Sequence, residues 1–355
     1  MTPSAPRIVD VNAVDPYERG RQRGAALRES LAAGIEIYLT LFATAGITRA
    51  QVREWAELSI DAAEAWSPEL VAEIRGTADG AEQEVWLIAA LNARTEILSQ
   101  GSGAKPGECS TIVNATAAPV GAQTWDWHEE LSGHWHLQQV AGNAHAFVGL
   151  TEHGILSKIG MNDAGIGIML NILGHQDDRV GGVPVHLVSA RVLAEAGTIE
   201  EAVEILTSAP VSTSSAITVL SPTAAVIVEL SPRGAVVLEP VDGVLLHTNH
   251  FLDAGLGQGE KPGLYDPDSQ LRHGVLVERV AREPLPSVAA QIVPYLLSAP
   301  GDLAQLCCVP EAGAVLGDRW ATLATVTLDP AARVMTVNAG SPRDTADATT
   351  VRLTP

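Results

Sequence analysis

The 355-residue sequence is short of cysteine and aromatic residues, and each shortage excludes a class of protein. Its three cysteines include the adjacent pair Cys307 and Cys308, and three are too few for a disulfide framework. Adjacent cysteines also seldom bridge each other, because a disulfide needs a geometry that neighbours meet poorly. Aromatic residues make up 4% of the chain, which favours a closely packed interior of sheets and helices over a stacking surface.

Basic residues are also scarce, with 22 lysines and arginines against 42 acidic residues and a net charge of −20. Such a charge repels phosphate backbones and anionic lipids, so we expect neither nucleic acid nor a membrane as partner. No window approaches the run of about 18 apolar residues that a spanning helix needs. The first ten residues lack the charged and apolar regions of a signal peptide. We therefore expect a cytoplasmic protein.

The composition is otherwise that of an ordinary globular protein, with 46% hydrophobic and 18% charged residues. The first hundred residues have helical patterns. Asp15 followed by Pro16 is a helix-start signal, with aspartate as N-cap and proline at the first helical position. Further helices are predicted over residues 49–66, from 67 onward, and over 85–98.

The pattern changes at Gly101, where a glycine-rich loop leads into short β-prone runs separated by turns. Helical segments interrupt these runs at residues 185–196, 199–206, 268–282 and 287–297. Helices, a strand block, central helices and further strands are typical of a layered α+β sandwich. Since nothing indicates a repeat or a linker, we expect a single domain.

Cys109 stands at the head of the β-prone run 111–116, and residues 124–127 lie where the far arm of a hairpin would be. A thiol there, beside a carboxylate, is a candidate nucleophile. Free cysteine has a pKa of about 8.5 and needs an activating neighbour. If the bond before Cys109 were cut, its freed α-amino group, with a pKa of about 7.7–8.0, would be a suitable base. The alternative is a small apolar strand residue.

Two further residues are candidates for the same chemistry. In a strand, Trp125 and Trp127 share one face and Asp126 points to the other, where its carboxylate could act beside the thiol. The alternative is a solvent-facing aspartate on an edge strand. Asn249 follows a β run, and its amide is a suitable donor to an oxyanion. The alternative is a turn asparagine.

Two groups of histidines have some likeness to metal sites. His247 and His250 form an H-x-x-H pair, and His128 precedes His134 and His136. Neither group has its remaining ligands at a recognised spacing, so we expect no metal. No nucleotide-binding glycine fingerprint is present, so we expect no cofactor.

Six segments taken in order resemble the acyl-coenzyme A:6-aminopenicillanic acid acyltransferase family. These are self-processing N-terminal-nucleophile (Ntn) hydrolases, related more distantly to choloylglycine hydrolases. The segments are YERGRQRG (17–24), NARTE (92–96), ECST (108–111), TWDW (124–127), GMNDAGIG (160–167) followed by Asn171, and HTNHF (247–251). Each is weak alone, but their order and spacing are fairly specific, and they run over nearly the whole chain.

The resemblance implies a four-layer αββα sandwich of the Ntn hydrolase type. It also implies autocatalytic cleavage between Glu108 and Cys109, giving a helical fragment 1–108 and a fragment 109–355 that stay associated. Cys109 would be both the self-processing residue and the mature nucleophile. Asp126 matches the family's catalytic aspartate and Asn249 its oxyanion asparagine.

The remaining site residues are also implied by the resemblance. Arg319 is the candidate for a late catalytic arginine, with Arg333 and Arg343 as alternatives. The substrate-binding residues would be Thr124, Trp125 and Asn171.

The predicted function is hydrolysis of a small N-acyl or peptide-like amide through a thioester on Cys109. One alternative is an acyltransferase that passes an acyl group from coenzyme A or an amide donor to an amine. A second is an unprocessed, non-catalytic binding protein. A coenzyme A thioester enters only as an acyl-donor substrate, and the sequence leaves the oligomeric state open, a homo-oligomer included.

Overall fold

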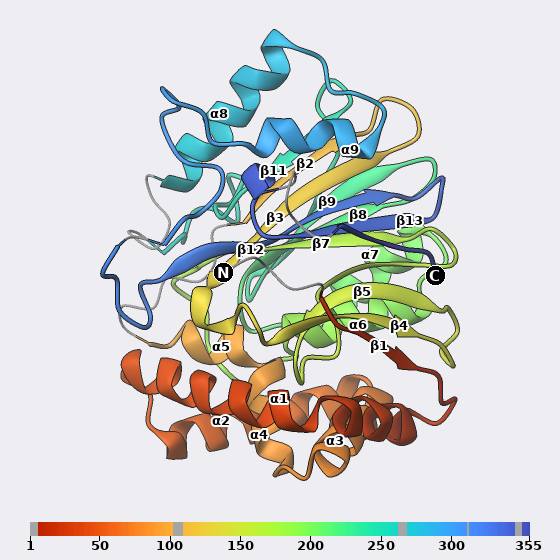
Figure 1. Ribbon diagram of the computed structural model, residues 1–355, viewed down its shortest axis with the longest axis vertical. Coiled ribbons are helices and arrows are strands. Elements are labelled where there is room, and N and C mark those ends of the chain that lie inside the picture. Colours follow the sequence, from red (N-terminus) through yellow and green to blue (C-terminus); the bar gives the residue numbers. More distant parts are fainter. Residues whose placement is uncertain (1–5, 102–108, 262–267, 311, 345–349) are drawn as a thin grey trace.

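Two β-sheets packed face to face form the centre of the molecule (Figure 1). The computed structural model describes residues 6–101, 109–261, 268–310, 312–344 and 350–355. The eight-stranded sheet has the order β1 (Ile8–Val11), β4 (Trp135–Val140), β5 (Phe147–Glu152), β6 (Ile159–Asn162), β7 (Gly167–Ile172), β8 (Ser215–Leu220), β9 (Ala225–Ser231) and β10 (Gly234–Leu238). The six-stranded sheet has the order β11 (Val244–His247), β2 (Ser110–Asn114), β3 (Val120–His128), β12 (Trp320–Asp329), β13 (Val334–Ala339) and β14 (Thr350–Leu353).

Helices cover the outer face of each sheet. On the eight-stranded sheet, α6 (Val185–Glu195) and α7 (Ile199–Ser208) pack against strands β6 to β10. On the six-stranded sheet, α8 (Asp268–Arg282) and α9 (Ala289–Ile292) lie over β2, β3, β11 and β12, at the top of Figure 1. Contacts of β2 with β7, and of β13 with β5 and β6, join the sheets. The predicted four-layer αββα sandwich is confirmed.

The side chains of strand β2 point alternately into two different hydrophobic cores. Val113 faces the main core, which includes the space between the sheets. Its neighbour Ile112 faces a second core under α8 and α9. Because successive side chains of a strand point to opposite faces, a strand between two apolar layers must be apolar on both. This double burial places the start of β2 deep inside the molecule.

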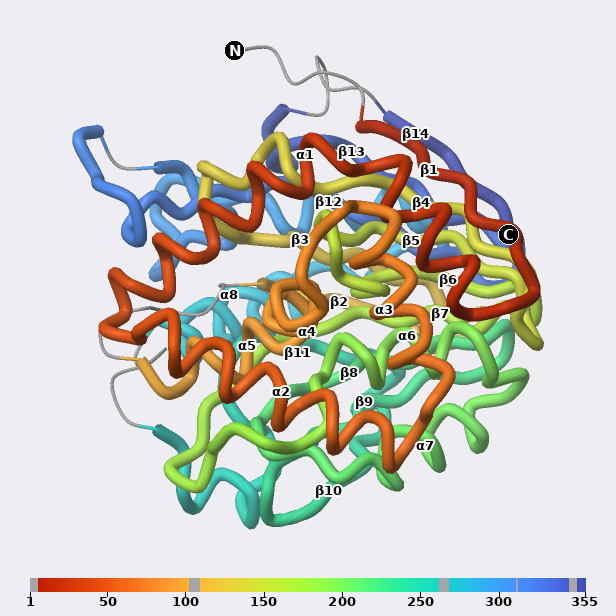
Figure 2. Tube along the Cα trace, turned by 90° about the horizontal axis from the view of Figure 1, so that it is seen from below, coloured from red at the N-terminus to blue at the C-terminus, as the bar shows by residue number. Residues whose placement is uncertain are grey.

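The N-terminal helices form a separate group below the sheets, in front when the molecule is seen as in Figure 2. They are α1 (Pro16–Thr44), α2 (Arg49–Trp66), α3 (Pro68–Ala81), α4 (Val85–Asn92) and α5 (Arg94–Leu98). The predicted start of α1 is confirmed, since Asp15 Oδ1 accepts a hydrogen bond from the Glu18 backbone at 2.9 Å. The helix predicted over 85–98 is divided at Ala93, which leaves the helical conformation. Three 3₁₀ turns complete the described elements: η1 (Glu129–Leu131), η2 (Val293–Leu296) and η3 (Pro342–Asp344).

Within the described residues, no single helix has both the length and the apolar character to cross a membrane. Helices α1 and α2, bent by 109° at their junction, meet that test only as a pair, by length and composition.

Glycines allow α1 and α3 to approach closely. A Cβ at Gly76 would overlap the carbonyl oxygen of Tyr17, and one at Gly20 would overlap that of Glu73. In contrast, a Cβ at Gly274 of α8 would meet no atom within 4 Å. The two helices are therefore in backbone contact, which only glycine permits at these positions.

We expect Gly76→Ala to lower the free energy of unfolding by about 1–3 kcal/mol, because the helices must move apart. The matched control is Gly274→Ala, which should raise it by about 0.5–1 kcal/mol through helix propensity alone. Urea unfolding of both variants measures the difference. Equal effects of the two substitutions would contradict this packing.

Candidate active site

Cys109 lies directly before β2, which pairs with β11 and β3 in the six-stranded sheet, and is 5% exposed. The predicted hairpin is confirmed, since β2 and β3 are antiparallel with Ser110 opposite Thr124. The carbonyl oxygen of Cys109 accepts hydrogen bonds from Asn171 Nδ2 of β7 at 2.9 Å and from Arg272 Nη1 of α8 at 3.3 Å. Two side chains from different layers thus hold the backbone at the head of β2. Glu108, the other half of the predicted cleavage site, lies outside the described residues.

Asp126 is 1% exposed on β3, between β2 and β12. The edge-strand alternative for this residue is therefore wrong. Thr322, the opposite residue on β12, donates a hydrogen bond to Asp126 Oδ1. The carboxylate and the thiol interact: burial raises the pKa of Cys109 to about 11, and the charge of Asp126 contributes to the rise. Lys158 and Arg272, together with a backbone hydrogen bond from Asp126, act in the lowering direction.

Asn249 follows β11 and is fully buried. Its Oδ1 accepts from Arg272 Nη2 at 3.0 Å, and its Nδ2 donates to the Ile172 carbonyl at 2.9 Å. Its backbone N–H donates to Ser269 Oγ at 2.7 Å. Because an arginine only donates, the amide orientation is settled by its partner. One of the two Nδ2 hydrogens is given to Ile172, which leaves one for a ligand.

Arg272 connects these parts, and the sequence analysis missed it. It is 1% exposed and reaches Cys109, Asn249 and, at 3.2 Å, Ser110 Oγ, while its Nε pairs with Asp268 Oδ2 at 2.6 Å. In sequence, Asp268 and Arg272 form an i,i+4 pair of the kind common on exposed helix faces. A signal was present, since Arg272 lies on the face that buries Val275 and Leu276 three and four residues later.

The three residues predicted to bind substrate surround the head of β2. Thr124 Oγ1 accepts from the Ser110 backbone at 3.2 Å. Asn171 Oδ1 accepts from Thr111 Oγ1 at 2.6 Å. Trp125 is 1% exposed, and its role toward a substrate remains a prediction.

Arg319 is not brought to this cluster by the contacts that the structure records. It precedes β12, its side chain is 39% exposed, and it pairs with Glu129 and Glu130. The alternatives also lie elsewhere: Arg333 occupies the turn between β12 and β13, and Arg343 donates to the Ser298 carbonyl at 3.1 Å. Their suggested catalytic role stays a prediction.

A buried ion cluster lies on the other side of the tryptophans. Glu152 of β5 accepts from Arg94 Nη2 of α5 at 2.6 Å and from Lys158 Nζ at 3.0 Å. The Tyr38 hydroxyl of α1 also donates to it. Burial alone would raise the pKa of Glu152, but the charges of Arg94 and Lys158 outweigh it and hold the pKa well below its usual range.

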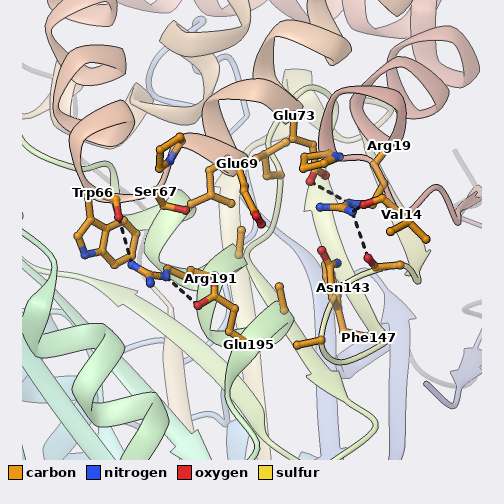
Figure 3. Close-up of a pocket in the computed structure, with 18 residues that line it drawn as sticks. Val14, Arg19, Trp66, Ser67, Glu69, Glu73, Asn143, Phe147, Arg191 and Glu195 are labelled. Carbon is orange, nitrogen blue, oxygen red and sulfur yellow. Dashed lines mark hydrogen bonds and ion pairs between the residues drawn. The ribbon is translucent and has the colours of Figure 1, made fainter.

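A large cavity lies away from Cys109. It has a volume of about 570 Å³ and lies between the N-terminal helices and α6 (Figure 3). Trp66, Glu69 and Arg191 are among its lining residues, and none of the predicted site residues is. Within the described parts of the chain, no group of three or more His, Cys, Asp or Glu side chains is arranged to hold a metal ion.

Comparison with known protein sequences finds a family and a relative that are similar to this chain. The family model of acyl-coenzyme A:6-aminopenicillanic acid acyl-transferase matches residues 113–344, which include Asp126, Asn249 and Arg319 and begin just after Cys109. The acyl-coenzyme A:6-aminopenicillanic-acid-acyltransferase 40 kDa form of Emericella nidulans is 30% identical over 272 residues, covering 73% of each chain.

Two solved structures are more distant. A mutant conjugated bile acid hydrolase from Clostridium perfringens has a TM-score of 0.44 and 13% identity, covering 69% of this chain and 92% of its own. Penicillin V acylase from Agrobacterium tumefaciens has a TM-score of 0.40 and 14% identity, covering 65% and 83%.

The fold and site define a four-layer α+β sandwich with a buried cysteine at the head of a central strand. The family model and the 30% identity to the Emericella nidulans protein both show that the chain belongs to the acyl-coenzyme A:6-aminopenicillanic acid acyltransferase family.

The ion cluster makes stability depend on pH. A carboxyl with a depressed folded-state pKa contributes stability above its unfolded pKa, and that stability is lost as the pH falls toward the folded value. Below about pH 4.5, protonation of Glu152 should therefore lower the free energy of unfolding of the wild type by about 1.4 kcal/mol for each pH unit.

We expect Glu152→Gln to lose this acid dependence and to be destabilised at pH 7 by about 3–5 kcal/mol, because two buried cations lose their partner. The control is Glu57→Gln, which breaks an exposed pair with Arg53 and should cost less than about 1 kcal/mol. Urea unfolding between pH 3 and pH 7 measures both. The idea fails if Glu152→Gln keeps the wild-type pH slope.

Proposed function

We propose that this protein is a cysteine Ntn amidohydrolase that cleaves a small N-acyl or peptide-like amide. One observation supports the proposal above others: Asp126 and Asn249 are both connected to Cys109 at the head of β2, the second of them through Arg272. Asp126 acts electrostatically on the thiol, and Arg272 links the Cys109 carbonyl to Asn249 Oδ1. Membership of a family of acyltransferases adds independent support.

The first step of the proposed chemistry is self-processing. Cys109 Sγ loses its proton and attacks the Glu108 carbonyl carbon. The Glu108–Cys109 C–N bond breaks, and the Cys109 nitrogen takes up a proton. A thioester between the Glu108 carbonyl carbon and Cys109 Sγ replaces the amide. Water then hydrolyses this thioester, which releases the Glu108 carboxylate and leaves Cys109 with a free thiol and a free α-amino group.

In the mature enzyme, the α-amino group takes the proton of the Cys109 thiol, and sulfur attacks the substrate carbonyl. The free Nδ2 hydrogen of Asn249 is the proposed donor to the oxyanion, a contribution of about 3–4 kcal/mol in other enzymes. The α-ammonium then protonates the leaving amine. Asp126 orients the α-ammonium by accepting a hydrogen bond from it. Water finally cleaves the acyl-thioester.

A second candidate function is acyl transfer, which the Emericella nidulans relative favours by its name. The same acyl-Cys109 would pass its acyl group to an amine in place of water, with a coenzyme A thioester or an amide as donor. Arg319 as a catalytic arginine and a cytoplasmic location are kept as predictions.

We also propose that the fragments 1–108 and 109–355 stay together after cleavage. Strand β1 pairs with β4 across the predicted division. Arg94 and Glu152, on opposite sides of it, form a fully buried ion pair. Separating the fragments would expose these groups, so we expect them to copurify.

Cleavage is tested first. We expect the purified wild type to show two masses that correspond to a cut between Glu108 and Cys109, and Cys109→Ala to stay whole, because no sulfur remains to attack. Cys307→Ala, which removes another buried thiol, is the control and should be cut like the wild type. An unbroken wild-type chain would sink the Ntn mechanism and favour the non-catalytic alternative.

Catalysis is tested with cut protein, incubated with acyl donors and a panel of amines, with the products identified by mass spectrometry. Hydrolysis yields the free acid, and transfer yields the new amide. We expect Asn249→Ala to lower kcat/KM by about 100- to 1,000-fold, because an oxyanion donor is lost. Asn338→Ala, a buried asparagine of β13 in the same sheet, should leave it within about threefold. Similar losses in both variants would refute the role of Asn249.

A further inference from the structure

Lys158 is a buried cation that the proposed chemistry does not use. It lies between β5 and β6 and is 4% exposed. Its Nζ is 3.0 Å from Glu152 Oε2 and 4.1 Å from the centre of the Trp125 ring, with Trp127 at 5.6 Å. Burying an ammonium group costs desolvation free energy unless the group is paired with an opposite charge. The buried position of Lys158 therefore indicates a specific role.

Lys158 shares its carboxylate partner with a second cation, Arg94, on which the buried carboxyl of Glu96 also acts. Arg94 and Lys158 share the single carboxylate of Glu152, which their charges keep ionised. Tyr38 stays neutral, because burial raises its pKa well above the usual value. Two buried histidines that interact with this cluster, His128 and His186, are neutral too, since burial lowers the pKa of His128 to about 4 and that of His186 well below its usual value.

Trp125 brings the Lys158 ammonium close to Cys109. Since Ser110 is opposite Thr124, the next position of the same antiparallel register sets Cys109 beside Trp125. The Lys158 ammonium lies against the ring of that tryptophan. Lys158 and Cys109 interact in both directions: Lys158 lowers the pKa of the thiol, and the thiolate raises the pKa of Lys158, which burial brings down to about 8.

The charged groups that face the thiol come from three elements. Asp126 of β3 opposes a thiolate, while Arg272 of α8 and Lys158 favour it. Arg272 is already engaged by Asp268, Asn249, Ser110 and the Cys109 carbonyl. In the uncut chain, the nitrogen of Cys109 belongs to a peptide bond and carries no charge. Lys158 is therefore the cation best placed to offset Asp126 at that stage.

We propose that Lys158 is a positioning residue for Cys109, whose ammonium, held in place by Glu152, stabilises the thiolate before and after the chain is cut. The inference rests on the proposed function, since it assigns Lys158 to the same nucleophile. A purely structural Lys158, present only to neutralise Glu152, would affect stability but not the acidity of the thiol.

The test is the pH dependence of alkylation of Cys109 by iodoacetamide, followed on its peptide by mass spectrometry. We expect Lys158→Gln, which can still donate a hydrogen bond to Glu152, to raise the apparent pKa of Cys109 by about one unit. Alkylation at pH 7, below the pKa of about 8 of Lys158, should then slow by about tenfold. Lys158→Arg keeps the charge and should stay within about twofold of the wild type. The Cys308 peptide is the internal control and should not change.

Two observations would overturn the inference. One is an unchanged Cys109 profile in folded Lys158→Gln, and the other is an equal slowing in Lys158→Arg. If Lys158→Gln does not fold, Lys158→Met gives the same test without a charge or a polar group. The time course of cleavage in the same preparations is a second readout, expected to be slower in Lys158→Gln than in Lys158→Arg.

Intact-mass measurement of the same samples separates this inference from the proposed function. A cut chain whose Cys109 alkylates alike in all variants overturns the role of Lys158 and leaves the Ntn function standing. An uncut chain whose Cys109 responds to Lys158→Gln overturns the Ntn function and supports the electrostatic role of Lys158.

Discussion

A charge enclosed in this protein is stable only beside an opposite charge or a full set of hydrogen bonds, and the site is built around this constraint. Arg94 of α5, Tyr38 of α1 and Lys158 all reach Glu152 at the end of β5. One buried carboxylate thus ties the N-terminal helices to the eight-stranded sheet. Removing Glu152 would leave two cations that the dry interior cannot solvate.

A second buried cation, Arg272, also connects two layers of the fold. Arg272 of α8 joins the backbone of Cys109 to the side chain of Asn249. The charges that act on Cys109 therefore come from Arg272 in the outer helical layer, from Lys158 in the segment between β5 and β6, and from Asp126 on β3. Burial makes the thiol a weak acid, and these flanking charges modulate it. The stability of the fold and the acidity of this thiol thus depend on neighbouring buried charges.

Much of the fold could be predicted from local patterns. The helix predicted over 49–66 has those bounds, and the hairpin of β2 and β3 pairs as its spacing indicated. These features depend on caps and on periodicities within a few residues of each other. The helix predicted over 287–297 was less accurate, since it contains only α9 followed by a 3₁₀ turn. Pro294 lies at that change and has no N–H to continue an α-helix.

By itself, the sequence determined the sandwich class and pointed to Cys109, Asp126 and Asn249, because a strand-opening cysteine, a carboxylate between tryptophans and a strand-end amide are legible in short segments. Only the tertiary structure decided their neighbours. Arg272 is marked only by its place on the apolar face of its helix, and Lys158 looks like an ordinary surface charge. Stacking of the sheets and of α8 brings both to the thiol. The physical reason is that burial and long-range electrostatics depend on which layers meet, and no local pattern records that.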